Sequence, residues 1–174
     1  DDTMLAPMPA IAMAAAATST LRVGTLVLGN DYKHPAVVAK EAATIDLLSD
    51  GRVELGLGAG WMIADYEEIG WEYDRPGVRI ERLEEAVAVI KGAWAPGAFS
   101  FAGDHYTITD YDATPETVQK PHPPLLIGGG GKRVLSLAAR EADIIGVNPN
   151  LAAGTYDPEV VKTALAGQTA EKIE

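Results

Sequence analysis

Short apolar runs without helical spacing alternate along this chain with longer stretches in which apolar residues recur every three to four positions. The apolar runs lie at 21–29, 52–60, 125–129 and 142–148. They are rich in β-branched and aliphatic residues, which is typical of strands buried on both faces. The repeated order of strand, loop and helix predicts parallel strands with right-handed crossovers, and therefore an α/β fold.

The stretches between these runs predict amphipathic helices. The helix that begins at Pro35 ends at Asp50-Gly51. An Ala-rich helix with Pro9 in its first turn precedes the first strand. The predicted helices span 8–17, 35–49, 78–94 and 132–140, and the second has Val38, Ala42, Ile45 and Leu48 on one face.

Two further segments complete the prediction. A β-hairpin is expected about Gly103-Asp104, and one more helix near the end of the chain. A length of 174 residues without a visible linker predicts one domain over 1–174. Periodicity alone is compatible with either a (β/α)8 barrel or an open doubly wound sheet.

The charge and the cysteine content of the chain limit the kinds of molecule that it is expected to bind. The chain has 14 Lys and Arg against 25 Asp and Glu, a net charge of −11, which disfavours binding to nucleic acid or to an anionic membrane surface. It has no cysteine, which excludes disulfides and thiolate metal sites and fits the cytoplasm. The apolar stretch at 8–17 is too short to cross a bilayer, and two aspartates precede it.

Glycines follow two of the predicted strands, in the runs GLGAGW at 56–61 and IGGGG at 127–131. The first does not fit a dinucleotide-binding fingerprint, because its glycine spacing differs and Trp61 follows. The second leads into a helix, and helix amides without side chains before them form an anion site. Both runs are compatible with simple packing turns, or with a phosphate-bearing cofactor above the sheet.

The sequence gives little support for a metal site or for a hydrolase. The sequence has no HExxH motif, no calcium loop and no nucleophile elbow, so no metal site is predicted. His34 precedes a helix start and is interpreted as positional. The five acids in the loop at 61–77 are interpreted as solvated side chains rather than as a glycosidase pair.

Three long segments together resemble the luciferase-like monooxygenase family, most closely its deazaflavin (coenzyme F-420)-dependent oxidoreductases. They are TLVLGNDYKHPAVVAKEAATIDLLSDGRVELGLGAGW, RPGVRIERLEEAVAVIKGAW and TVQKPHPPLLIGGGGKRVLSLAAREADIIGVN. The resemblance implies an α/β fold of the (β/α)8 TIM-barrel type, of which this chain carries the third to sixth strand units. The remaining strands lie outside it, so a fragment of a longer protein is expected.

The resemblance also implies the cofactor site. A strand bulge with a cis peptide at Leu26-Val27 would back the cofactor ring. Ring and tail contacts would come from Gly58, Ala59 and Gly60, and phosphate contacts from Gly128, Gly129 and Gly130. Trp61, Asn30 and Asn148 are expected at the substrate pocket, where Trp61 replaces the acid of family members that oxidise sugar phosphates.

Three functions follow as hypotheses. The first is hydride transfer between a deazaflavin and a small organic substrate, with catalytic residues outside this chain. The second is an FMN-dependent monooxygenase on the same backbone, and the third is a non-catalytic fragment or binding module. The resemblance also implies a homodimer.

Overall fold

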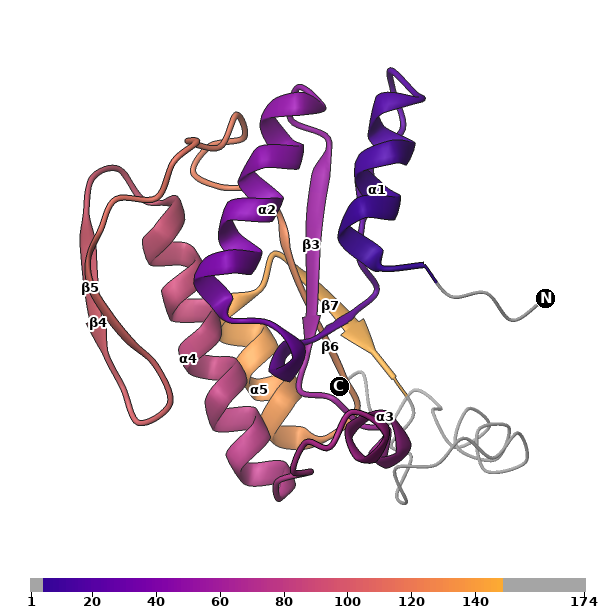
Figure 1. Ribbon diagram of the computed structural model, residues 1–174, viewed down its shortest axis with the longest axis vertical. Helices are drawn as coiled ribbons and strands as arrows, with labels where there is room; N and C mark the ends of the chain where they lie inside the picture. Colours follow the sequence, from indigo (N-terminus) through magenta and orange to yellow (C-terminus); the bar gives the residue numbers. More distant parts are fainter. Residues whose placement is uncertain (1–4, 149–174) are drawn as a thin grey trace.

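The computed structural model describes residues 5–148, and the helix expected near the end of the chain lies outside this range. The central element is a sheet in which every pairing is parallel, with the strand order β1/β2, β3, β6, β7. Strands therefore alternate with helices as predicted, and the α/β class is confirmed (Figure 1). The strands are β1 (Val23–Gly24), β2 (Leu28–Gly29), β3 (Val53–Gly58), β6 (Leu125–Gly129) and β7 (Ile144–Val147).

The first predicted strand is not continuous. Its two parts, β1 and β2, both pair with β3, through Gly24 opposite Glu54 and Leu28 opposite Leu57. The chain between these pairs is one residue longer on the β1/β2 side, which makes a bulge. The Leu26–Val27 peptide inside the bulge is cis. The bulge and its cis peptide are those that the family resemblance implies, and they divide the strand predicted over 21–29 into β1 and β2.

The helices lie close to their predicted positions, and three of them begin at a proline. His34 precedes one of these starts, and its Nδ1 accepts a hydrogen bond of 3.3 Å from the amide of Ala36, which confirms its positional role. The short helix α3 and the 3-10 turn η1 were not predicted. The helical elements are α1 (Pro7–Ala16), η1 (Asn30–Tyr32), α2 (Pro35–Leu48), α3 (Ile63–Glu68), α4 (Pro76–Trp94) and α5 (Lys132–Glu141).

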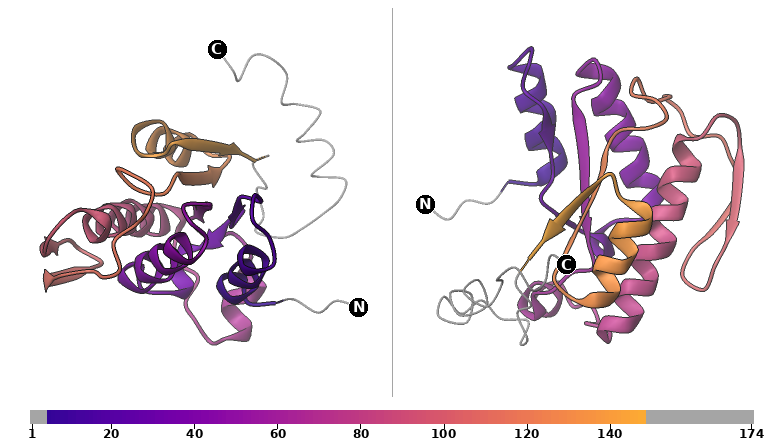
Figure 2. Two further views of the ribbon diagram at one scale, coloured as in Figure 1. Left: turned by 90° about the horizontal axis from the view of Figure 1, so that it is seen from above. Right: turned by 180° about the vertical axis from the view of Figure 1, so that it is seen from behind.

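One face of the sheet packs against the helices. In Figure 2 the helices α2, α4 and α5 follow one another around this side, and α4 contacts both of the others. Alternate residues of β3 and β6 enter this core, together with the face of α4 that carries Leu83, Val87 and Ile90. Leu48, which was predicted on the apolar face of α2, is 77% exposed and does not join the core. The fully buried members of the core include Leu55, Leu57, Leu83, Val87, Ile90, Leu125 and Ile127.

A two-stranded antiparallel hairpin, β4 (Phe99–Ala102) and β5 (Thr107–Tyr111), lies on the outer side of α4 (Figure 1). The carboxylate of Glu85 on α4 accepts hydrogen bonds from three backbone amides of its turn, those of Asp104, His105 and Tyr106. The hairpin prediction is therefore confirmed. No helix within residues 5–148 is long and apolar enough to span a membrane.

Candidate functional site

A row of glycines crosses the sheet near the carboxyl ends of its strands. Gly29 pairs in register with Gly58, Gly58 with Gly128, and Gly128 with Gly146. Residues in register on parallel strands share a face, and in this row none of them has a side chain. The result is a strip of bare backbone four strands wide.

Val27 covers the middle of this strip. A Cβ atom added to Gly58 would lie 2.7 Å from Val27 Cγ2, and one added to Gly128 would lie 2.9 Å from Val27 Cγ1. The bulge therefore sets the Val27 side chain directly on the glycine row, where only glycine leaves room for it. Leu26, its partner in the cis peptide, is 82% exposed. The structure thus brings together four of the predicted site residues, Leu26, Val27, Gly58 and Gly128.

The turn after β3 is fastened from the helix side by Arg79, which is 5% exposed. Its Nη1 donates to the carbonyl oxygen of Ala59 at 3.1 Å and also to that of Gly60. Its Nε donates to the carbonyl of Asp74 at 3.0 Å, and the guanidinium carbon lies 4.0 Å from the centre of the Tyr73 ring. The Arg79 side chain therefore holds Ala59 and Gly60 in place, the two predicted contact residues that follow β3.

A second layer of polar side chains supports this turn. The Tyr66 hydroxyl donates to Asp31 Oδ2 at 3.0 Å, and Arg82 Nη1 lies 3.0 Å from Asp31 Oδ1. Arg82 also pairs with Asp74. Burial, followed by the charge of Asp31, raises the pKa of the Tyr66 hydroxyl, which keeps it a neutral donor. Gly60 is left-handed, with φ 73°, and the Tyr66 hydroxyl oxygen lies 2.0 Å from the position that a Cβ atom would take.

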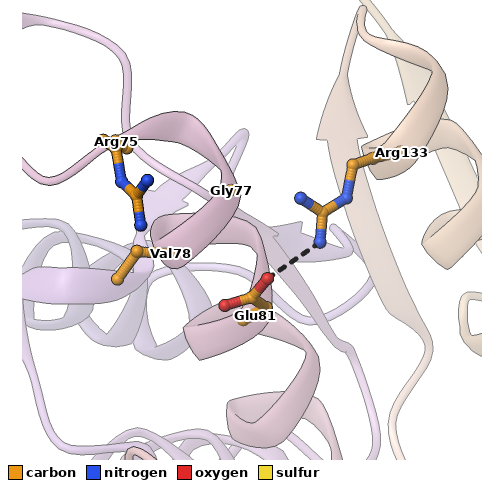
Figure 3. A pocket seen from close by; sticks show the side chains of 5 residues that line it. All are labelled: Arg75, Gly77, Val78, Glu81 and Arg133. Carbon is orange, nitrogen blue, oxygen red and sulfur yellow. Dashed lines mark hydrogen bonds and ion pairs between the residues drawn. The ribbon is translucent and has the colours of Figure 1, made fainter.

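The glycines at the end of β6 and directly after it lead into α5. A Cβ on Gly129 would lie 2.5 Å from Val134 Cγ1, so this glycine allows strand and helix to pack closely. A Cβ on Gly131 would meet no atom of residues 5–148 within 4 Å. The first amides of a helix lack partners within it. Beside this turn, Arg75 and Arg133 flank a shallow pocket that is also lined by Gly77, Val78 and Glu81, and Arg133 pairs with Glu81 at 3.1 Å (Figure 3).

The three residues predicted at the substrate pocket differ in their positions. The side-chain nitrogen of Asn148 lies 3.9 Å from the Cβ position of Gly128, beside the glycine row. Trp61 is 42% exposed at the end of the β3 turn, and its carbonyl accepts a hydrogen bond from Tyr73. Asn30 is buried, and its amide nitrogen donates to Tyr106 of the hairpin at 3.3 Å. Asn30 is therefore engaged with the hairpin side, unlike the other two.

Arg79 is the site residue that sequence reasoning missed. It lies on the same helical face as the buried residues Leu83, Ala86 and Ile90. A charged residue inside an apolar stripe of a helix has to find a polar partner, and this is the signal that could have identified it.

The parts of this site suit a flat cofactor that carries a phosphate. Val27 on the glycine row offers an apolar platform, and the amides after β6 offer hydrogen-bond donors for an anion at its edge. Both lie at the carboxyl ends of parallel strands, where barrel enzymes carry their active sites. No group of three or more potential metal-binding side chains occurs within residues 5–148.

The fold is of the TIM-barrel type, and the glycine platform lies near the carboxyl ends of its parallel strands. The chain belongs to the luciferase-like monooxygenase family, whose model matches residues 1–167. It is 34% identical over 139 residues to an FMNH2-dependent dimethylsulfone monooxygenase of Pseudomonas putida, covering 80% of this chain and 38% of that protein. It is 36% identical over 143 residues to an F420-dependent glucose-6-phosphate dehydrogenase of Amycolatopsis mediterranei, covering 80% and 40%.

Solved structures support the fold. An F420-dependent secondary alcohol dehydrogenase superposes with a TM-score of 0.77 at 22% identity, covering 96% of this chain and 51% of its own. The monooxygenase RslO1 from Streptomyces bottropensis superposes with a TM-score of 0.75 at 24% identity, covering 92% and 47%. The chain thus spans about two fifths of the length of the relatives it matches, and about half of these structures.

Proposed function

We propose that this chain is the cofactor-binding part of an oxidoreductase that transfers a hydride between a deazaflavin, coenzyme F-420, and a small organic substrate. The observation that carries the proposal is the in-register row of Gly29, Gly58, Gly128 and Gly146, with Val27 lying on it. Such a platform supports a flat ring system, and the bound deazaflavin would supply hydride chemistry at its central ring carbon.

Each predicted residue has a part in this proposal. Leu26 and Val27 support one face of the ring, and Gly58, Ala59 and Gly60 border it. Gly128, Gly129 and Gly130, with the first amides of α5, hold the phosphate. Trp61 and Asn148 border the substrate. Since Trp61 stands where the sugar-phosphate-oxidising members carry an acid, a sugar phosphate is not proposed as the substrate.

An FMN-dependent monooxygenase is the second candidate. It is favoured by the 34% identity to the FMNH2-dependent dimethylsulfone monooxygenase of Pseudomonas putida. The same platform and the same phosphate site would serve FMN, and the two candidates differ in the chemistry that the bound ring supplies. We place either enzyme in the cytoplasm, as a homodimer without nucleic-acid or membrane partners.

The deciding experiment is a fluorescence titration of the full-length protein with oxidised coenzyme F-420 and, separately, with FMN. Selective binding of the deazaflavin supports the first candidate, and selective binding of FMN supports the second. Folded protein that binds neither would remove both and leave a non-catalytic module. Mass photometry of the same sample tests the homodimer.

A further inference from the structure

Arg79 is a buried cation without a carboxylate partner among residues 5–148. Its neighbours Asp31 and Asp74 direct their carboxylates to Arg82 instead. Buried charges in proteins are normally paired with an opposite charge. Carbonyl oxygens satisfy the donors of Arg79, and the Tyr73 ring covers its face. The guanidinium is therefore fully hydrogen-bonded without a carboxylate in direct contact with it.

The two carbonyls that Arg79 binds in the β3 turn fix the direction of two amides. In a trans peptide the N–H points opposite to the C=O. The carbonyls of Ala59 and Gly60 point to Arg79, so the N–H groups of Gly60 and Trp61 point away from it. Within the part of the chain that the structure describes, neither amide donates to a protein acceptor. Two amide donors without an acceptor among residues 5–148 therefore lie on the side of the turn opposite to the buried Arg79 guanidinium.

We propose that Arg79 is a positioning residue for an anionic group of the cofactor. It holds the amides of Gly60 and Trp61 toward that group and supplies positive charge from behind the turn. Carbonyls that bind a guanidinium polarise their own peptide groups, which strengthens the N–H groups as donors. The charge is buried, so solvent ions screen it weakly. This inference rests on the proposed function, since it requires a flavin or deazaflavin at the site.

Two parts of such a cofactor carry negative charge: the phosphate, and the ring once it is reduced. The experiment separates them in the full-length protein and its variants Arg79→Met, Arg79→Lys and, as a control, Arg140→Met, which removes an exposed cation of α5. Dissociation constants are measured for FMN and for riboflavin, which lacks the phosphate, and for coenzyme F-420 and its phosphate-free core. The midpoint potential of the bound cofactor is measured as well.

If the anion is the phosphate, Arg79→Met weakens FMN about tenfold more than riboflavin, and Arg79→Lys keeps the preference for FMN because it keeps the charge. If the anion is the reduced ring, the reduced forms of FMN and riboflavin weaken together, more than their oxidised forms do, and the midpoint potential of the Arg79→Met variant becomes more negative. Arg140→Met changes neither quantity. If Arg79→Met does not fold, the dissociation constants and the midpoint potential of Arg79→Lys are used to test the inference instead.

Equal loss of FMN and riboflavin with an unchanged potential would overturn the inference and leave the proposed function standing, because the turn would then be held for packing alone. An Arg79→Lys variant that loses the phosphate preference without a change in potential would overturn it too. Wild-type protein that binds none of the four ligands would instead refute the proposed function, and this inference with it.

Discussion

The side chain of Val27 rests on Gly58 of the neighbouring strand, with no room for even one methyl group between them. A Cβ on Gly58 would come within 2.7 Å of Val27 Cγ2. The bulge between β1 and β2 and the glycine at the end of β3 therefore form one arrangement. Neither would form this platform without the other.

Gly58→Ala is therefore expected to destabilise the protein by about 2 kcal/mol, because the added methyl overpacks the site. In a Val27→Ala background the same substitution should cost much less, since the clashing methyl groups are gone. Urea unfolding of the single and double variants measures this coupling. Gly56→Ala is the control: its Cβ would lie 1.9 Å from the backbone oxygen of Thr25, so Val27→Ala should not rescue it.

Gly60 and Gly70 separate backbone strain from side-chain collision. Their φ angles are nearly equal, 73° and 71°, but a Cβ on Gly60 would lie 2.0 Å from the Tyr66 hydroxyl oxygen, whereas one on Gly70 would meet no described residue within 4 Å. Gly70→Ala should cost about 1 kcal/mol, the penalty for a left-handed alanine. Gly60→Ala should cost about 1–3 kcal/mol more.

Thermal and urea unfolding of the two variants test this difference. Adding Tyr66→Phe to Gly60→Ala removes the colliding oxygen and should recover part of the loss. Equal destabilisation by Gly60→Ala and Gly70→Ala would show that the collision is relieved by a small shift of Tyr66.

Long periodic elements were predictable from the sequence. The spacing of Leu83, Val87 and Ile90 identifies the face of α4 that enters the core, because one helical period repeats over five turns. The helix α3 was missed because its six residues are too few for a periodic signal. Leu48 continues the apolar pattern of α2 and yet is exposed, since it falls in the last helical turn.

The candidate site was harder to predict from the sequence than the long helices. Nothing in the residue types of Leu26 and Val27 indicates a break in the strand, and only resemblance to a family located it. The contact of Val27 with Gly128 depends on the alignment of three strands, which no local pattern specifies. Asn30 follows a strand end like Asn148, but the η1 turn directs its amide to Tyr106.

Arg82 is expected to be important for stability because it compensates Asp31, whose side chain is only 5% exposed. Arg82→Met leaves that carboxylate buried and unpaired, which should cost about 3 kcal/mol. Arg133→Met is a matched control, since Arg133 and its partner Glu81 are 58% and 53% exposed and such pairs contribute about 0.5 kcal/mol. Urea unfolding at neutral pH compares them. A loss for Arg82→Met no larger than that for Arg133→Met would mean that water reaches Asp31.

The turn of the β4–β5 hairpin should loosen in acid because Glu85 holds it. Burial raises the pKa of the Glu85 carboxyl, but the amides of His105, Asp104 and Tyr106 outweigh this effect and lower the pKa below its ordinary value of 4.5. A lowered pKa in the folded state means that the charged carboxylate stabilises the fold above that value, and that this contribution is lost as the pH falls through the lowered pKa.

Hydrogen exchange at the three amides, followed from pH 7 to about pH 3 and corrected for intrinsic rates, measures this loss. Protection should fall in the acid range in the wild-type protein. In Glu85→Gln it should be low at every pH, and at neutral pH the free energy of opening should be about 1 kcal/mol below that of the wild type. Glu84→Gln is the control, since among residues 5–148 that neighbouring glutamate pairs only with the half-exposed Arg140, and its loss should leave the profile unchanged. Protection that is independent of pH in the wild type would show that the hairpin holds its turn without the Glu85 carboxylate.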